Sequence, residues 1–307
     1  MFNKKGEIII EFTDSCFLSQ TRTQGWNDET MSRVRALIFG FCERGMSKKI
    51  MEIGCGNGVI TCFAAERYPE FSFTGIDIDT ELVREAKKKA KLKQIHNVRF
   101  RVSDINKEAD AQYDMVYTHY TLVDTKEPEK LFDSMFRLVC EDGVMCCAEP
   151  LYQCDCNNVY MPFLTDEDKY TMNRILRRIL IEIPRERGID RLFGMRLPEM
   201  FNRYGLKETR IDVVAAYEYS KEYTNERKQQ ILKNSNEVLE DTKRYRERLE
   251  YNKLFSLLGK EDLDAYTRLQ YVISECIVNN PEHYFSTGNF TYSNMIIIKG
   301  KKEDSIK

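Results

Sequence analysis

Residues 50–61 read Ile-Met-Glu-Ile-Gly-Cys-Gly-Asn-Gly-Val-Ile-Thr, an apolar run followed by three alternating glycines and a second apolar run. This pattern predicts a buried strand, a glycine turn and a helix that begins where the turn ends. Glycines permit backbone angles closed to other residues, and they let a ligand touch the main chain. Asp77 stands at the end of the next apolar run. Together these features indicate a site for an adenine nucleoside at the edge of a sheet.

The spacing of the glycines separates two kinds of nucleoside site. A dinucleotide fingerprint runs G-x-G-x-x-G. Here Val59 occupies the third glycine position, and the extra glycine, Gly58, comes one residue earlier. Glu52 lies two residues ahead of the first glycine. A pyrophosphate at the helix N-terminus would gain little from this carboxylate, whereas a ligand with an ammonium and a sulfonium would gain from it. The pattern therefore favours a cationic ligand over a diphosphate.

The pattern Glu-x-Gly-x-Gly-x-Gly at 52–58 closely resembles the first motif of class I S-adenosylmethionine-dependent methyltransferases. The resemblance has specific motifs over about residues 30–150 and is loose over 192–215 and 290–300. It implies an α/β fold with a Rossmann-like, doubly wound, seven-stranded sheet, in which the seventh strand is antiparallel beside the fifth. It also implies S-adenosyl-L-methionine as the cofactor.

The chain alternates strand-like and helix-like pieces from residue 26 to about 150, which predicts a parallel doubly wound sheet. The expected strands are 49–53, 71–76, 98–102, 115–118 and 144–148, and the expected helices are 26–42, 57–68, 80–92 and 127–139. The second half of the chain does not alternate strands and helices in this way. It predicts helices at 165–183 (ended by Pro184), 197–204 and 262–278, a long polar helical tract at about 224–258, and strands at 209–215 and 292–299.

These elements divide the chain into an N-terminal segment, a core and two insertions. The expected ranges are 1–25 for the N-terminal segment or cap, 26–150 for the S-adenosylmethionine-binding core, 151–190 for a helical insertion, 191–216 for the continued core, 217–288 for a second helical insertion or lid, and 289–307 for the final core strand and tail. Trp26, the single tryptophan, either helps the segment before it to close over the cofactor or simply anchors that segment.

The residues expected to bind the cofactor follow the ends of successive strands. The carboxylate of Asp77 can accept both ribose hydroxyls, while Asp79 is expected to cap the next helix. In the family that the chain resembles, the residue at Asp104 meets the adenine amino group and the residue at Ile105 packs on the ring. Alternatively, Asp104 is a helix N-cap. The complete set is Glu52, Gly54, Cys55, Gly56, Gly58, Asp77, Ile78, Asp104, Ile105 and Thr118.

Two titratable residues at the carboxyl ends of strands are candidates for catalysis. His119 follows the fourth strand, and an imidazole titrates near neutral pH, which suits a general base. Glu149 follows the fifth strand, where a carboxylate would orient the acceptor or take a proton. A core or surface histidine and an ordinary loop carboxylate are the alternative interpretations.

Composition narrows the partners and the compartment. The chain has 307 residues and a formal net charge of -2, which argues against a nucleic-acid binder. No apolar run approaches the roughly 20 residues that span a bilayer. Ten cysteines without framework spacing suit a cytoplasmic protein. Cys146-Cys147 and Cys154-x-Cys156 lack the usual zinc spacing, so they are expected to be free thiols, and no metal is predicted.

The predicted function is methyl transfer from S-adenosylmethionine to a small organic acceptor. The side chains expected to flank the acceptor crevice are Tyr152, Tyr160, Met161, Phe163, Tyr284 and Phe285. The Asn/Asp-Pro-Pro-Tyr/Phe tetrad that methylates exocyclic amines is absent after the fourth strand, where residues 118–121 read Thr-His-Tyr-Thr. Methylation of nucleic-acid amino groups is therefore disfavoured.

Three other functions remain open from the sequence. The chain could methylate a protein or RNA that docks through 224–258, reduce or oxidise a substrate with a nicotinamide cofactor, or bind S-adenosylmethionine without catalysis. The expected partners are a small-molecule acceptor, with neither a membrane nor a nucleic acid. A homodimer is compatible with the sequence, which does not decide the oligomeric state.

Overall fold

The computed structural model describes residues 28–40, 48–108, 112–152, 159–252, 255–287 and 289–303. The expected N-terminal cap at 1–25, Trp26, and the pair Cys154 and Cys156 lie outside these residues. The described chain forms two compact units. We call residues 29–153, 184–215 and 294–307 the sheet unit, and residues 154–183 and 216–293 the helical unit.

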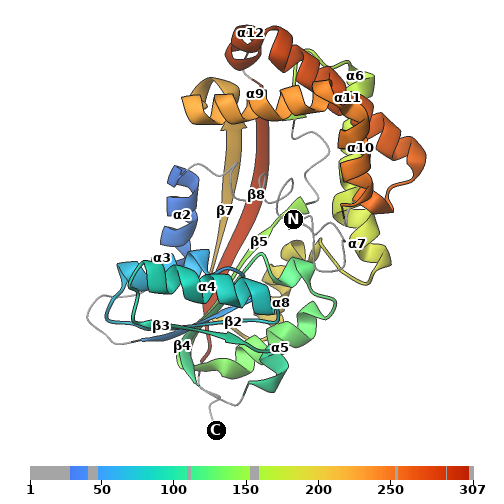
Figure 1. Ribbon diagram of the computed structural model, residues 1–307. Coiled ribbons are helices and arrows are strands. Elements are labelled where there is room, and N and C mark those ends of the chain that lie inside the picture. Colours follow the sequence, from blue (N-terminus) through green and yellow to red (C-terminus); the bar gives the residue numbers. More distant parts are fainter. Residues whose placement is uncertain are drawn as a thin grey trace, which may run out of the picture. The chain divides into compact units, whose positions relative to one another are not determined.

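The strands are β1 (Lys49–Ile53), β2 (Ser72–Asp77), β3 (Val98–Val102), β4 (Tyr113–His119), β5 (Val139–Pro150), β6 (Val159–Tyr160), β7 (Lys207–Tyr219) and β8 (Phe290–Lys301). The sheet unit has the strand order β3-β2-β1-β4-β5-β8, and β7 also pairs with β8 (Figure 1). The pairs among the first five strands are parallel, and β8 is antiparallel to β5. The predicted doubly wound sheet, with its last strand antiparallel beside the fifth, is therefore confirmed.

Helices pack on this sheet because its central strands are mostly apolar and are buried along most of their length. They are α2 (Asp28–Phe39), α3 (Val59–Arg67), α4 (Thr80–Leu92), α5 (Pro128–Leu138) and α8 (Leu197–Arg203), with 3-10 turns at Ile105–Lys107, Leu122–Asp124 and Phe193–Arg196. In β1, every residue from Ile50 to Ile53 is buried, as expected for a parallel sheet covered on both faces. The ring of Phe39 meets that of Tyr117 edge-on at 5.3 Å, which ties α2 to β4.

The helical unit has a core of its own. It contains α6 (Asp166–Arg177), a π-helical segment (Arg178–Glu182), α9 (Asn225–Glu240), α10 (Thr242–Glu250), α11 (Lys260–Asn279) and α12 (Pro281–Ser286), with 3-10 turns at Ser220–Glu222 and Phe255–Leu257. The strand β6 pairs antiparallel with the first two residues of β8. Buried residues from α6, α11 and α12, among them Ile175, Tyr266 and Leu269, form one hydrophobic cluster. No helix in the described part of the chain is long and apolar enough to cross a membrane.

This core corrects one expectation about the acceptor crevice. Tyr284 and Phe285 are 7% and 8% exposed and belong to the hydrophobic cluster of the helical unit, against which Met161 and Phe163 also pack. Their apolar surface is used to hold helices together, so they do not line an open crevice. The side chain of Tyr160 is not among those that the structure describes.

Two helix boundaries also differ from the sequence prediction. The tract at 224–258 is not one helix, because the backbone turns at Asp241 (φ -147°, ψ 75°) between α9 and α10. Helical structure does not stop at Pro184 but continues as α7 (Ile183–Glu186). Proline lacks an N–H and normally clashes with the carbonyl four residues earlier, and the wider turn of the preceding π-helical segment accommodates it.

Asp241 provides a stability prediction for the helical unit. Its side chain accepts a hydrogen bond from the N–H of Arg244 at 2.8 Å and so caps α10. We expect Asp241→Ala to lower the free energy of unfolding by about 1 kcal/mol, the usual value of such a cap. Asp241→Asn, which keeps an accepting oxygen, should restore most of it. Urea titrations of both variants test this, and equal losses in the two would contradict the capping role.

Candidate functional site

The three glycines of the turn between β1 and α3 all have left-handed backbone angles. Gly54, Gly56 and Gly58 have φ values of 69°, 52° and 72°, which other residues rarely adopt. A Cβ on Gly54 would overlap the side chain of Thr121, and one on Gly58 would lie 2.7 Å from the ring of Phe100. A Cβ on Gly56 would meet nothing within 4 Å. The outer glycines therefore permit close packing, whereas the middle one faces open space and leaves its backbone accessible to a ligand.

Asp77 holds this turn to the end of β2. One carboxylate oxygen accepts the N–H of Gly56 at 2.8 Å, and the other accepts the N–H of Asp79 at 2.9 Å. Asp79 in turn caps α4 by accepting from the N–H groups of Glu81 and Leu82, as the sequence predicted. Each oxygen of Asp77 has a second lone pair. Its carboxylate can therefore still accept hydrogen bonds from a ribose placed against the turn.

Glu52 lies beneath the turn rather than in the open. It is 2% exposed, and one oxygen accepts hydrogen bonds from the hydroxyls of Thr61 and of Tyr117, the latter at 2.8 Å. Burial raises the pKa of Glu52 to about 7. The carboxylate is turned toward protein groups, so its effect on a bound cation would be electrostatic and not a direct contact. Cys55, also predicted to bind the cofactor, is 6% exposed, and burial raises the pKa of its thiol well above the usual range.

The residues expected around the adenine ring have different environments. Asp104 caps the turn Ile105–Lys107 by accepting from the N–H of Asn106 at 3.0 Å, so the N-cap interpretation is realised. Ile105 is buried at 5% exposure, whereas Ile78, directly after Asp77, is 77% exposed. A large apolar side chain left in solvent beside the turn offers a surface on which a flat ring can pack. Of the apolar pair, Ile78 is therefore the more accessible.

Glu149 corrects the expectation that it faces the acceptor. It is fully buried, and its carboxylate accepts hydrogen bonds from the backbone N–H groups of Thr121 (3.2 Å), Leu122 (3.1 Å) and Val123 (3.5 Å). The hydroxyl of Thr121 also donates to the carbonyl of Ile53 at 3.1 Å. Glu149 thus fixes the loop after β4 against the glycine turn. It is a positioning residue, and burial raises its pKa to about 7.

The end of β4 carries the other candidate base. The Nε2 atom of His119 is buried and has no hydrogen-bond partner in the part of the chain that the structure describes. Burial and the positive charge of Arg35 lower the pKa of His119 to about 4. The imidazole is therefore neutral at physiological pH, and it can accept a hydrogen bond but is a weak base. Thr118, expected to bind the cofactor, is 0% exposed and pairs with Ile53 and Cys147 inside the sheet, so its side chain is not open to solvent.

Sequence reasoning missed one residue at this edge. Thr121 connects the loop after β4 to the glycine turn through its hydroxyl. Its only signal in the sequence was its position after the fourth strand. Its neighbour Tyr120, which the sequence placed at the crevice beyond that strand, has a φ of 58°, a strained angle for a residue with a large side chain, and such strain is concentrated at functional sites.

Comparisons with known proteins agree with this geometry. Residues 45–182 match the model of a methyltransferase domain family. An uncharacterized methyltransferase of Schizosaccharomyces pombe, C1B3.06c, is 32% identical over 109 residues, which cover 33% of this chain and 39% of the relative. Malonyl-[acyl-carrier protein] O-methyltransferase 1 of Ilyobacter polytropus is 29% identical over 91 residues, which cover 29% of this chain and 33% of the relative. The matches thus span well under half the length of these curated relatives.

A solved structure shares the fold. The phosphoethanolamine N-methyltransferase 2 of Haemonchus contortus, in complex with phosphomonomethylethanolamine and S-adenosylhomocysteine, superposes with a TM-score of 0.51 at 13% identity, covering 96% of this chain and 58% of that one.

The sheet order and the glycine turn define a nucleoside-binding protein of the doubly wound α/β class. Within that class, residues 45–182 match a methyltransferase domain family, and the sheet order and glycine turn are those of a class I S-adenosylmethionine-dependent methyltransferase domain. S-adenosyl-L-methionine is the cofactor of this family. The residues fit it, because the turn at Gly56 offers an open backbone surface, Asp77 offers a carboxylate for the ribose, and Ile78 offers an exposed apolar side chain for the adenine.

Proposed function

We propose that the protein transfers the methyl group of S-adenosyl-L-methionine to a small organic acceptor. The observation that carries this proposal is the glycine turn, in which the backbone at Gly56 is open and its N–H is held by Asp77. A turn built only for packing would close all three glycine positions with side chains, as happens at Gly54 and Gly58.

Each residue has a limited task in this reaction, because the bound cofactor supplies a methyl group that is already activated for displacement. The turn at 54–58 and Asp77 bind the nucleoside, and Ile78 and Asp104 lie on the adenine side. The loop after β4, held by Glu149, forms a firm wall beside the turn. Rigid alignment of this kind can supply several kcal/mol of the reduction in the barrier, on the order of the entropy of bringing two reactants together.

The described residues offer no strong general base at this edge. Glu149 is committed to backbone N–H groups, and His119 has a pKa of about 4. We therefore propose that the acceptor presents an atom that is already nucleophilic at neutral pH, and that His119 orients it by accepting a hydrogen bond.

A small acceptor is favoured over RNA or an acidic protein by the charges on α10. This helix belongs to the expected docking tract, but three of its basic residues are paired: Lys243 with Glu247, Arg246 with Glu250 and Asp264, and Arg248 with Glu237. These pairs leave α10 without the stripe of unpaired basic side chains that nucleic-acid binding requires. The relative from Ilyobacter polytropus is named for O-methylation of a malonyl group that a carrier protein bears, which supports transfer to an acceptor oxygen and leaves the size of the acceptor to the charges on α10. The cytoplasmic location stays a prediction.

The proposal is tested by measuring binding and turnover with the purified protein. Calorimetric titration with S-adenosylmethionine and S-adenosylhomocysteine should show binding of both. Incubation of the protein with labelled donor and metabolite extracts should then transfer the label to a low-molecular-weight product. Tight donor binding without transfer to any extract would favour the non-catalytic alternative, and absence of donor binding would refute the proposal.

Asp77→Ala should weaken donor binding by about 1–3 kcal/mol, the cost of losing hydrogen bonds to a charged acceptor. The variant loses the proposed contacts to the ribose and the tether of the Gly56 N–H. Asp79→Ala is the matched control, because that carboxylate serves the start of α4 and should affect stability without changing affinity. Equal donor affinity in Asp77→Ala and the wild type, measured calorimetrically, would remove the assignment.

A further inference from the structure

Arg191 is a buried arginine that uses few of its hydrogen-bond donors within the described part of the chain. It is 8% exposed, its Nη2 lies 2.9 Å from the Oδ1 of Asp124, and its guanidinium carbon lies 5.6 Å from the ring centroid of Tyr152. The Nε and Nη1 atoms are buried and have no hydrogen-bond partner among the described residues. These two nitrogens carry three of the five N–H donors of the side chain.

An arrangement of this kind is costly unless something else accepts these hydrogen bonds. A guanidinium stays charged at any physiological pH, and each buried donor without a partner costs about 1–3 kcal/mol. Such groups are rare in folded proteins, and each calls for an explanation, such as a bound ligand or a catalytic role.

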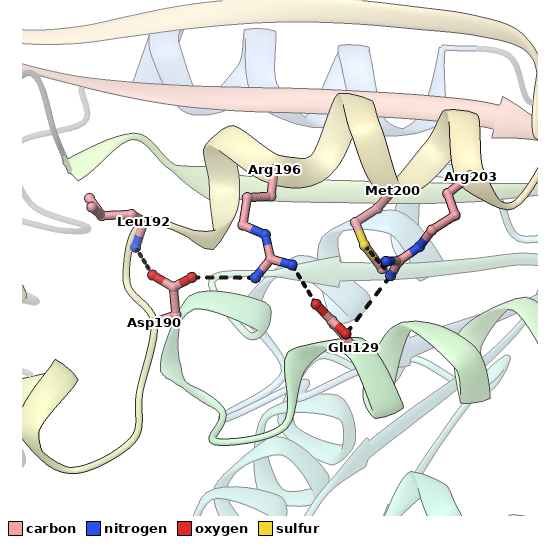
Figure 2. Close-up of polar contacts among 6 residues, drawn as sticks. All are labelled: Glu129, Asp190, Leu192, Arg196, Met200 and Arg203. Carbon is pink, nitrogen blue, oxygen red and sulfur yellow. Dashed lines mark hydrogen bonds and ion pairs between the residues drawn. The ribbon is translucent and has the colours of Figure 1, made fainter.

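The neighbouring residues show that the segment around Arg191 is well anchored. Figure 2 shows Arg196 between two carboxylates, bonded to Glu129 on α5 and 3.7 Å from Asp190. Asp190 also accepts the N–H of Leu192 at 3.0 Å. The residues on both sides of Arg191 are therefore held by contacts within the sheet unit, and Arg191 is presented from a fixed backbone with most of its donors unpaired among the described residues.

The position of Arg191 relates it to the proposed reaction. Its partner Asp124 ends the turn Leu122–Asp124, in the loop that Glu149 clamps beside the glycine turn. Tyr152, over which the guanidinium lies, comes two residues after the end of β5. Arg191 thus stands at the carboxyl ends of β4 and β5, the edge at which doubly wound sheets bind their ligands.

We propose that Arg191 is the recognition residue for an oxyanion, a carboxylate or a phosphate, carried by the methyl acceptor. The inference rests on the proposed function and names the chemical class of its acceptor. A planar guanidinium matches such groups geometrically, and hydrogen bonds between two charged groups are roughly twice as strong as neutral ones. Asp124 fixes the orientation of the fork through one nitrogen, which leaves the other two for the acceptor. The charge of Arg35, which acts on His119, adds a second positive group at the same end of β4.

The test uses simple probes on the full chain loaded with S-adenosylhomocysteine. Malonate, inorganic phosphate and the neutral analogue malonamide are titrated calorimetrically, with sodium chloride at matched ionic strength as the reference. We expect malonate or phosphate to bind and malonamide not to bind, and the stronger of the two anions distinguishes a carboxylate from a phosphate acceptor. Arg191→Met should abolish anion binding, and Arg191→Lys should weaken it at least tenfold because lysine lacks the planar fork.

Arg196→Met is the matched control, because that arginine lies in the same segment but its charge is used by Glu129 and Asp190. It should bind the anion like the wild type. Absence of anion binding to the wild type, or unchanged binding to Arg191→Met, would overturn the inference. If Arg191→Met does not fold, Arg191→Lys decides in the same way. Titration of S-adenosylhomocysteine itself, together with anion titrations in its absence, separates the two claims. Failure to bind that nucleoside, with anion binding retained, would refute the proposed function alone.

Discussion

Gly56→Arg is expected to abolish binding of S-adenosylmethionine while the protein stays folded. A side chain at this position meets no protein atom within 4 Å, so it would extend into the space that we assign to the donor. The left-handed φ of 52° adds some backbone strain, which costs roughly 1–2 kcal/mol for a residue other than glycine. The loss of affinity should therefore far exceed the loss of stability.

Gly205→Arg separates these two effects. Gly205 also has a left-handed φ, 67°, and a Cβ there would also meet nothing within 4 Å, but the residue lies after α8 and away from the glycine turn. It should share the strain and keep the affinity for the donor. Calorimetric titration and urea unfolding of both variants make the comparison. Donor affinity in Gly56→Arg close to that of Gly205→Arg would show that the turn does not hold the ligand.

The second large effect is expected in the dependence of stability on pH. Burial raises the pKa of Glu52 and of Glu149 to about 7, above the value of 4.5 expected in the unfolded chain. Between these values the folded state holds a proton that the unfolded state has released. The stability contributed by each carboxyl is therefore complete below about pH 4.5 and is lost as the pH rises through 7. Each group should account for about 3 kcal/mol of the decrease in the free energy of unfolding between pH 4 and 8.

Glutamine variants isolate these contributions from that of His119. The pKa of His119 is lowered to about 4, so its contribution has the opposite sign and is lost as the pH falls below 6.5. Between pH 5 and pH 8, the free energy of unfolding should fall less in Glu52→Gln and in Glu149→Gln than in the wild type, and urea titrations at the two pH values measure this. Glu70→Gln, at an exposed position, is the control and should follow the wild type. If the free energy of unfolding changed equally with pH in all four proteins, the burial of ionisable carboxyls at this site would be contradicted.

Much of the sheet unit could be predicted from sequence because its signals are local. The apolar run of β1 and the glycine turn lie within a dozen residues, and Asp79 caps α4 through N–H groups two and three residues later. The break at Asp241 was missed because the polar composition of 224–258 suits one helix as well as two. Only the backbone at Asp241 shows that its side chain begins a new helix there.

The candidate site divides in the same way. Sequence alone determined that a glycine turn and Asp77 lie together at a strand edge, because parallel strands align their carboxyl ends. Tertiary structure alone decided which polar groups are buried and which groups they contact. The carboxylate of Glu149 accepts hydrogen bonds from backbone N–H groups 26 to 28 residues earlier in the chain. Arg191 contacts Asp124, which lies much further away in the sequence. Burial and hydrogen-bond partners of this kind depend on how distant segments pack, and no local pattern records them.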